Sequence, residues 1–238
     1  MHSKPFLFKK FIINQDQCAM KVGTDAILLG AWANISHNPY SILDIGAGTG
    51  ILSLMLAQRC YAEQIDAIEI EDNAYEQCVN NFENSTWSDR LFCYHASLEE
   101  FVDEIDDTYD LIISNPPFYT EDYKSSKYTR DLARFEDAMP FEHLVESVSK
   151  LLSKNGKLVV VIPFKEETPF ITLASKKHLF PNKFLRVKGN SETPFKRSLI
   201  EFSFDKKEMV VEELTIETSR HVYTQNYTNL TKDFYLKM

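Results

Sequence analysis

Two short turn motifs hold the residue types that could do chemistry in this chain of 238 residues. The first is Asp44-Ile-Gly46-Ala-Gly48-Thr-Gly50, and the second, 65 residues after Gly50, is Asn115-Pro116-Pro117-Phe118. Each motif follows a short apolar run that is typical of a β-strand. The first pattern is typical of a nucleotide-binding turn, and the second can grip an amide-like or exocyclic amine nitrogen.

The glycine-rich motif has the features of a ligand cradle. Its three glycines, Gly46, Gly48 and Gly50, allow a sharp bend and a close backbone approach with no Cβ in the way. The helix expected from Ile51 would point its first N–H groups at the same ligand. Glu69, 19 residues after Gly50, ends the next expected strand, where a carboxylate can accept both hydroxyls of a ribose.

Two details of this motif disfavour a dinucleotide cofactor. The spacing is G-x-G-x-G and not G-x-G-x-x-G. Asp44 would repel a pyrophosphate, but it can receive the α-ammonium group of a methionine moiety, directly or through water. The motif therefore predicts S-adenosylmethionine as the cofactor. Ser97, just after the third expected strand, is a further candidate contact near the adenine of the cofactor.

The second motif predicts the acceptor of a methyl group. Two successive prolines fix φ and make the turn rigid, so the Asn115 amide oxygen and the Pro116 carbonyl can act as converging acceptors. The lone pair of an exocyclic amine is delocalised into its ring, and two fixed acceptors favour a pyramidal, more nucleophilic nitrogen. Proximity and preorganised charge then accelerate transfer without a strong base. Phe118 can stack on a flipped-out base.

Alternating apolar runs and amphipathic stretches predict a Rossmann-like α/β fold with a mostly parallel central sheet and an antiparallel C-terminal edge hairpin. We expect a single domain, 1–238, with an N-terminal cover over 1–40, a catalytic core over 41–205 and an extension over 206–238. The expected parallel strands are 41–45, 64–70, 91–95, 110–114 and 157–162; the hairpin strands lie near 184–187 and 198–204. The expected helices are 25–33, 51–60, 72–84, 98–105, 141–152 and 166–176.

Charge is unevenly distributed along the chain, whose formal net charge is −9. Residues 61–122 hold 17 acidic side chains and one basic one, whereas residues 176–197 hold seven basic side chains and one acid. A local basic surface is enough to bind nucleic acid. The alternative is that these lysines form a solvated face. The predicted RNA contacts are Lys196, Arg197, and Arg130 and Arg134 of the long segment 119–139.

The remaining composition points to a cytoplasmic protein without a membrane span. No apolar run approaches the ~20 residues that a span needs. The start lacks the features of a secretory signal. The four cysteines are widely spaced without a CxxC pair, so we expect reduced thiols, no metal site and no disulfide frame. We expect a monomer.

The two motifs and their flanks resemble a known family. The glycine motif followed by Asn115–Phe118 is similar to class I S-adenosylmethionine-dependent methyltransferases that act on exocyclic or amide nitrogen. The segments 6–11, 20–32 and 230–238 resemble the bacterial tRNA1(Val) adenine-N6 methyltransferase family. The similarity extends along almost the whole chain. This resemblance implies that Gly23 and Thr24 help to cover the cofactor, and that Asn115–Phe118 holds adenine 37 of a tRNA. Phe135 stands where the resemblance leads us to expect a histidine.

Three other functions remain as alternatives. A protein glutamine-N5 methyltransferase usually has an N-terminal helical domain, for which the roughly 40 residues before Asp44 leave no room. A guanine-N2 rRNA methyltransferase has a similar turn but is usually longer. A catalytically inactive RNA-binding module could keep the fold, although the intact glycine turn, Glu69 and Asn115 argue against it.

Overall fold

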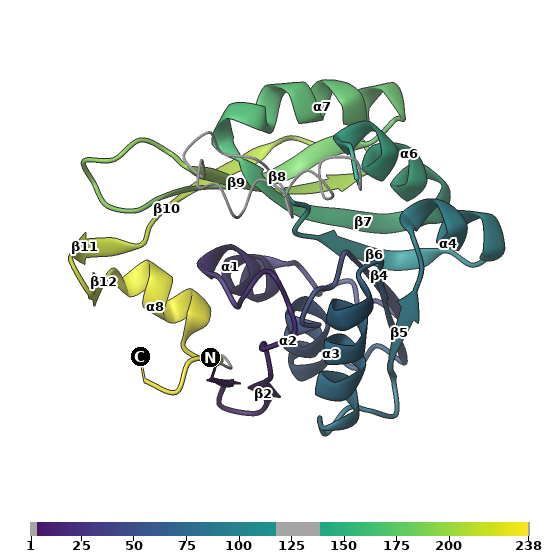
Figure 1. The fold of residues 1–238 in the computed structure, drawn as a ribbon. Helices are drawn as coiled ribbons and strands as arrows, with labels where there is room; N and C mark the ends of the chain where they lie inside the picture. Colours follow the sequence, from purple (N-terminus) through teal and green to yellow (C-terminus); the bar gives the residue numbers. More distant parts are fainter. Residues whose placement is uncertain (1–3, 118–138, 238) are drawn as a thin grey trace, which may run out of the picture.

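The computed structural model describes residues 4–117 and 139–237, and it contains a central eight-stranded sheet covered by helices on both faces (Figure 1). The order of the strands is β10-β8-β9-β7-β6-β3-β4-β5. The strands are β3 (Ser41–Ile45), β4 (Gln64–Glu69), β5 (Leu91–His95), β6 (Tyr109–Ser114), β7 (Leu152–Pro163), β8 (Phe180–Lys188), β9 (Arg197–Ser203) and β10 (Val210–Thr215).

The helices form a layer on each face of the sheet. One layer contains α1 (Thr24–Trp32), α2 (Ile51–Arg59) and α3 (Asp72–Glu83), and the other contains α4 (Leu98–Glu104), α6 (Phe141–Leu151) and α7 (Glu167–Lys176) (Figure 1). Successive strand residues point to opposite faces, so Ile42 packs in the first layer and Leu43 in the second. Both side chains are fully buried, as expected for a sheet covered on both sides.

The five predicted parallel strands and their helices are confirmed, most with ends within one or two residues of the expected ones. The strands β7, β6, β3, β4 and β5 are neighbours in parallel register. β7 begins at Leu152, five residues before the predicted start. The carboxyl ends of these parallel strands meet at one edge of the sheet, which we call the carboxyl edge.

The C-terminal half of the sheet differs from the expectation in one respect. β8 and β9 are antiparallel, as predicted, and β9 joins β7. However, β10 pairs in parallel with β8 and takes the outer position, so the hairpin is not at the edge. The sequence signal for β10 is weak because most of its residues are exposed, and Leu214 is its one buried residue.

The two ends of the chain lie together beside α1 (Figure 1). Near the N-terminus β1 (Phe6–Leu7) pairs with β2 (Ile12–Ile13), and near the C-terminus β11 (Glu217–Ser219) pairs with β12 (Val222–Tyr223). The last helix, α8 (Gln225–Thr231), packs against α1. The Lys9 N–H donates to the Phe234 carbonyl at 2.9 Å, which joins the two ends.

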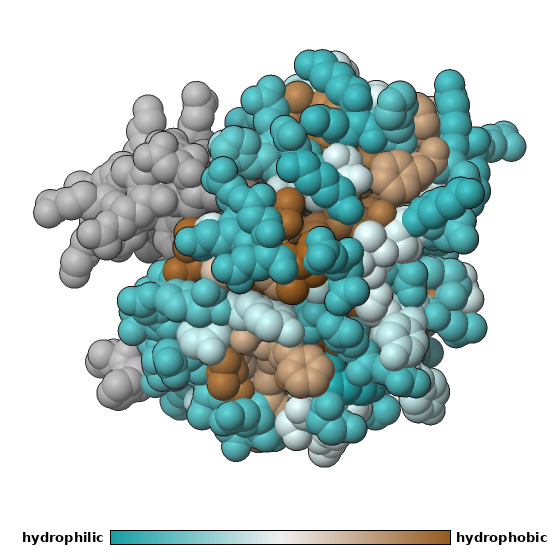
Figure 2. Space-filling view, turned by 90° about the vertical axis from the view of Figure 1, so that its right-hand side faces the viewer, coloured by the Kyte–Doolittle hydropathy of each residue, from teal (hydrophilic) through white to brown (hydrophobic). Residues whose placement is uncertain are grey.

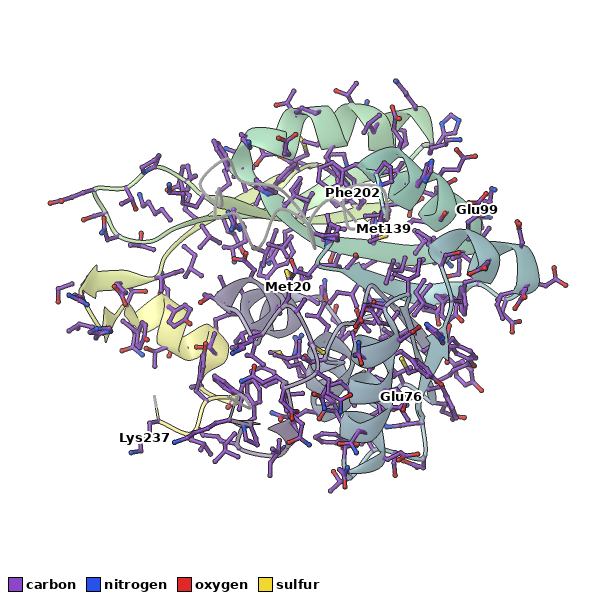
Figure 3. The ribbon with its side chains drawn as sticks, in the orientation of Figure 1. Met20, Glu76, Glu99, Met139, Phe202 and Lys237 are labelled. Carbon is purple, nitrogen blue, oxygen red and sulfur yellow. The ribbon has the colours of Figure 1, made fainter. Side chains whose placement is uncertain are left out.

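The acid-rich segment 61–122 lies at the β5 end of the sheet. Figure 2 looks at the side of β5 and shows a mostly hydrophilic surface with small apolar patches. Glu76 on α3 and Glu99 on α4 are exposed on that side, and Lys237 lies on the opposite side (Figure 3). The acid-rich segment is therefore concentrated around β4, β5, α3 and α4, whereas β8 and β9 lie toward the other end of the sheet.

Candidate active site

The two motifs leave neighbouring strands at the same level. Ile45 at the end of β3 and Ser114 at the end of β6 are register partners, and the Ser114 hydroxyl donates to the Ile45 carbonyl at 2.8 Å. The next residues are Gly46 and Asn115, so the turns start about 4.8 Å apart, the spacing of adjacent strands. The strand order reverses between β3 and β6, and open α/β sheets bind ligands at such a point.

The glycine turn is tied to the neighbouring strand β4 and faces open space at Gly48. The N–H groups of Gly46 and Ala47 both donate to the Ile68 carbonyl at 3.0 Å. Gly48 has φ +54°, and a Cβ added there would meet no atom within 4 Å. A Cβ at Gly50 would instead lie 2.5 Å from Phe82, so that glycine allows close packing on α3. The turn is therefore tightly packed at Gly50 and open at Gly48.

Asp44 is a fully buried carboxylate with one free oxygen. Its Oδ2 atom accepts from the Ser53 N–H at 3.1 Å and from the Ser53 hydroxyl at 2.8 Å. Its Oδ1 atom has no hydrogen-bond partner in the described part of the chain. Burial, with a smaller contribution from the charge of Glu69, raises the pKa of Asp44 to about 7, although the bonds from Ser53 oppose the shift. An ammonium group at Oδ1 would satisfy both the orphan acceptor and the buried charge.

Glu69 holds the backbone around the turn. Its Oε2 atom accepts from the Gly48 N–H at 2.7 Å, and its Oε1 atom accepts from the N–H groups of Ile70 and Glu71 at 2.9 and 3.0 Å. A carboxylate has about four acceptor positions. Glu69 can therefore accept one further hydroxyl, whereas accepting both ribose hydroxyls requires release of Gly48.

Asn115 presents a second orphan acceptor next to the first motif. Its Oδ1 atom is shielded from solvent and has no hydrogen-bond partner among the described residues. Pro116, which follows it, is buried. The predicted acceptor pair of Asn115 Oδ1 and the Pro116 carbonyl stays a prediction, and the structure supplies an unpartnered Asn115 oxygen for it. Phe118, Arg130, Arg134 and Phe135 lie outside the described residues.

The predicted N-terminal cover is tied to the glycine turn through α3. The Asn81 side chain accepts from the Asn14 N–H at 2.9 Å and donates to the carbonyls of Asn14 and Thr49, each at 2.9 Å. One turn earlier, Gln77 accepts from the Gln17 N–H at 3.0 Å. Sequence reasoning missed both amides. In the sequence, the available signal was a pair of polar residues four positions apart on an otherwise apolar helix face. In the structure both are buried, at 2% and 1% exposure.

The cover continues into the start of α1. Burial raises the pKa of the Cys18 thiol to about 12, and the negative charges of Glu69 and Glu71 add to this shift. The segment therefore passes close to the carboxylates of the site. Gly23 is the N-cap of α1 and Thr24 its first residue, and both are exposed.

Ser97 lies beside Glu69 but already has a structural role. The N–H of the preceding residue, Ala96, donates to the Glu69 carbonyl at 3.2 Å. The Ser97 hydroxyl accepts from the Glu100 N–H at 3.1 Å, and the Glu100 side chain accepts from the Ser97 N–H at 2.9 Å. This capping box begins α4.

The basic segment 176–197 does not form one surface. Lys188 ends β8, Lys196 immediately precedes the antiparallel β9 and Arg197 begins it, which places these three residues at the carboxyl edge. Lys176 and Lys177 precede β8 and lie toward the other edge. Arg197 Nε donates to Asp25 Oδ2 at 2.7 Å, so its charge also fixes the start of α1.

Two basic residues near the N-terminus lie by the far end of α2, the helix that begins at the glycine turn. Lys9 and Lys10 line a hollow of about 490 Å³ together with Arg59 at the end of α2. Of the basic residues considered, those at the ends of β8 and β9 are therefore the ones at the same sheet edge as the two motifs. Within residues 4–117 and 139–237, no group of three or more His, Cys, Asp or Glu side chains could hold a metal ion, and no helix there is long and apolar enough to cross a bilayer.

These features define the class of protein. The open glycine turn, the orphan oxygen of Asp44 and the carboxylate of Glu69 fit a cofactor with an amino-acid end and a ribose, and Asn115 adds an acceptor for an amine. Fold and site together are those of a class I S-adenosylmethionine-dependent methyltransferase.

Comparison with known proteins narrows this class. The model of the methyltransferase small domain family matches residues 22–179. The tRNA1(Val) (adenine(37)-N6)-methyltransferase of Christiangramia forsetii is 60% identical over 100% of both chains. The protein of the same name from Flavobacterium psychrophilum is 62% identical, covering 98% of this chain and 100% of that protein. The chain belongs to the family of tRNA1(Val) (adenine(37)-N6)-methyltransferases.

Solved structures agree with the fold. A predicted O-methyltransferase from Agrobacterium tumefaciens superposes with a TM-score of 0.67 at 18% identity, covering 88% of this chain and 96% of that chain. At this level of identity the similarity concerns the fold alone. The predicted fold class, enzyme class and cofactor are confirmed by these comparisons together.

Proposed function

We propose that this protein transfers a methyl group from S-adenosylmethionine to the exocyclic N6 of an adenosine in a tRNA anticodon loop, adenosine 37 of tRNA1(Val). The relatives carry this activity in their names. The structural observation that carries the proposal is the pairing of Ile45 with Ser114, which brings the cofactor turn and the unpartnered Asn115 oxygen together.

The chain's own groups would bind and orient the reactants. Asp44 Oδ1 would hold the ammonium group of the cofactor and Glu69 a ribose hydroxyl, with the Gly48 backbone nearby. Gly23 and Thr24 at the start of α1, and Ser97 at the start of α4, are proposed as its further contacts. When bound, S-adenosylmethionine supplies a methyl group activated by its sulfonium.

Asn115 would act on the acceptor nitrogen. Its Oδ1 atom and the Pro116 carbonyl would each accept one N–H of the adenine amine, which favours a pyramidal nitrogen and positions its lone pair. Phe118 is proposed to stack on the base, and Arg130, Arg134, Lys196 and Arg197 are proposed to contact the RNA. A carboxylate base is not required, because the proton leaves after the nitrogen has become cationic.

The test is methylation of unmodified tRNA1(Val) with labelled cofactor, followed by mass spectrometry of the nucleosides. We expect N6-methyladenosine at position 37. N2-methylguanosine would assign the guanine-N2 alternative, and label in protein would assign the glutamine-N5 alternative. Cofactor and RNA binding without any labelled product would indicate an inactive binding module.

We also propose that the protein works as a monomer in the cytoplasm, where its substrate is made and used. Sedimentation of the complex with tRNA tests the stoichiometry, since one protein per tRNA is expected.

A further inference from the structure

A pair of aromatic rings lies at the carboxyl edge near the β8–β9 loop. Phe164 begins the 3-10 helix η2 (Phe164–Glu166), and its ring centroid is 5.4 Å from that of Phe195. Phe164 directly follows Pro163, the last residue of β7. Phe195 lies two residues before Arg197, the β9 residue that pairs with Pro163. Ser114 pairs with Val160, so Phe164 lies one strand across from Asn115 and three residues beyond its level, about 11 Å away by strand geometry.

The ring of Phe164 is held in place by Arg186. The Arg186 guanidinium faces the Phe164 ring at 5.5 Å from its centroid. The same guanidinium binds both oxygens of Glu167, at 2.6 and 3.1 Å, and Glu167 also accepts from the Ser198 hydroxyl. Because Glu167 is buried, this network holds Phe164 and its neighbour Phe195 in a defined place.

Two lysines lie beside the ring of Phe195, one in space and one in sequence. Lys188 Nζ lies 5.3 Å from the centroid of Phe195, and Lys196 next to Phe195 is exposed. In the described part of the chain neither Lys188 nor Lys196 makes an ion pair, whereas Lys183, Arg186 and Arg197 each do. Cations beside an aromatic ring are the combination that binds single-stranded nucleic acid.

The loop that supplies the ring is already ordered. The Asn190 side chain accepts from the N–H groups of Glu192 and Thr193 at 3.0 and 3.1 Å, and the Thr193 hydroxyl accepts from the Asn190 N–H at 3.1 Å. Glu192 is the one acid in this loop and is exposed. A preformed turn lowers the entropy lost on binding.

We propose that Phe195 stacks on a nucleobase that flanks the target adenosine, and that Lys188 and Lys196 contact the phosphates of that nucleotide. The inference rests on the proposed function and names a second contact with the same RNA. Every base has a π-face, so this contact would add affinity and register with little sequence preference. It would set how the loop enters the site, and it would leave the reacting amine to Asn115.

Two variants test the ring. Phe195→Ala should weaken binding of an anticodon stem-loop RNA roughly 5- to 150-fold, the range for loss of one base–aromatic stack. Cofactor affinity should not change. Phe195→Trp should bind like wild type, and its indole fluorescence should be quenched as the RNA is added. Phe92→Ala, at an exposed ring on β5, is the matched control.

Abasic RNAs identify the partner base. We expect an abasic nucleotide at tRNA position 36 or 38 to weaken wild-type binding by a factor similar to that of Phe195→Ala, and to have little further effect in that variant. Independent, multiplicative effects of both abasic RNAs would overturn the proposal. So would Phe195→Trp fluorescence that RNA does not change, even if Phe195→Ala should fail to fold. These binding measurements need no turnover, so an absence of N6-methyladenosine from wild type would reject the proposed function separately.

Discussion

The Asn81 side-chain amide donates to the Thr49 carbonyl at 2.9 Å and so joins α3 to the glycine turn. The same amide group also binds both backbone groups of Asn14. The turn and the N-terminal cover are therefore held by one side chain that is 1% exposed.

Replacing this amide should loosen the cofactor site. In Asn81→Asp an oxygen would face the carbonyls of Asn14 and Thr49, so two hydrogen bonds, each worth roughly 0.5–1.5 kcal/mol, are lost. We expect weaker cofactor binding by calorimetry and faster proteolysis of the N-terminal segment. Asn80→Asp, at the exposed neighbouring position, is the control. Equal cofactor affinity in the two variants would contradict the coupling.

Asn115→Ala should reduce turnover while leaving cofactor binding nearly unchanged. The lost acceptor is engaged only with the reacting amine, and one preorganised group of this kind typically contributes ~10²–10³ in rate. Single-turnover rates with saturating tRNA, beside a cofactor titration, measure the two effects separately. Asn115→Asp keeps an acceptor oxygen and should retain more activity. An alanine variant within a few-fold of the wild-type rate would refute the assigned role.

Gly48→Val should abolish cofactor binding. The side chain would fill the opening at the turn, and a β-branched residue is strained at φ +54°. Gly189→Val is the control, because a Cβ at Gly189 meets Thr193 at an ordinary 3.6 Å. Calorimetric titration with S-adenosylmethionine is the measurement. Retained affinity in Gly48→Val would place the cofactor elsewhere.

Cofactor affinity should depend on the ionisation of Asp44. Burial raises its pKa to about 7, so the carboxylate is protonated below that pH and cannot pair with an ammonium group. Affinity should then fall up to tenfold per pH unit below about 7 and level off above it. Asp44→Asn should remove this dependence. An unaltered pH profile in that variant would show that another group titrates.

The raised pKa of Asp44 also makes the stability of the cofactor-free protein depend on pH. The folded state holds a proton that the unfolded chain releases, since the unfolded pKa of an aspartate is about 3.9. The Asp44 contribution to stability is therefore present at low pH and is lost as the pH rises through about 7. Thermal melting of wild type and Asp44→Asn across this range measures the difference.

The ion pair between Asp25 and Arg197 should contribute to stability as well as to the position of α1. Both side chains are less than one-third exposed, and the two residues are 172 positions apart in the chain. A double-mutant cycle with Asp25→Ala and Arg197→Ala should give a coupling of about 1 kcal/mol in the free energy of unfolding. Lys196→Ala should not alter stability. Additive effects of the two alanine variants would show no coupling.

Much of the fold could be predicted from the sequence because its signals are local. The alternation of buried strands and amphipathic helices requires only neighbouring residues, and β3 and β5 have the predicted ends. The glycine turn was predictable for the same reason, since its three positive φ angles favour glycine at those positions. Asp44, Glu69 and Asn115 lie at the carboxyl edge of the sheet, as their predicted places near strand ends require, while their roles stay predictions.

Only the tertiary structure decided the contacts between distant segments. The bridge from Asn81 to Asn14 and Thr49, the pairing of Arg197 with Asp25 and the outer position of β10 each join residues that share no local pattern. The division of the basic segment between the two sheet edges follows from strand direction. These features depend on how the whole chain packs, because burial and register, and not residue type, select which of many possible polar partners meet.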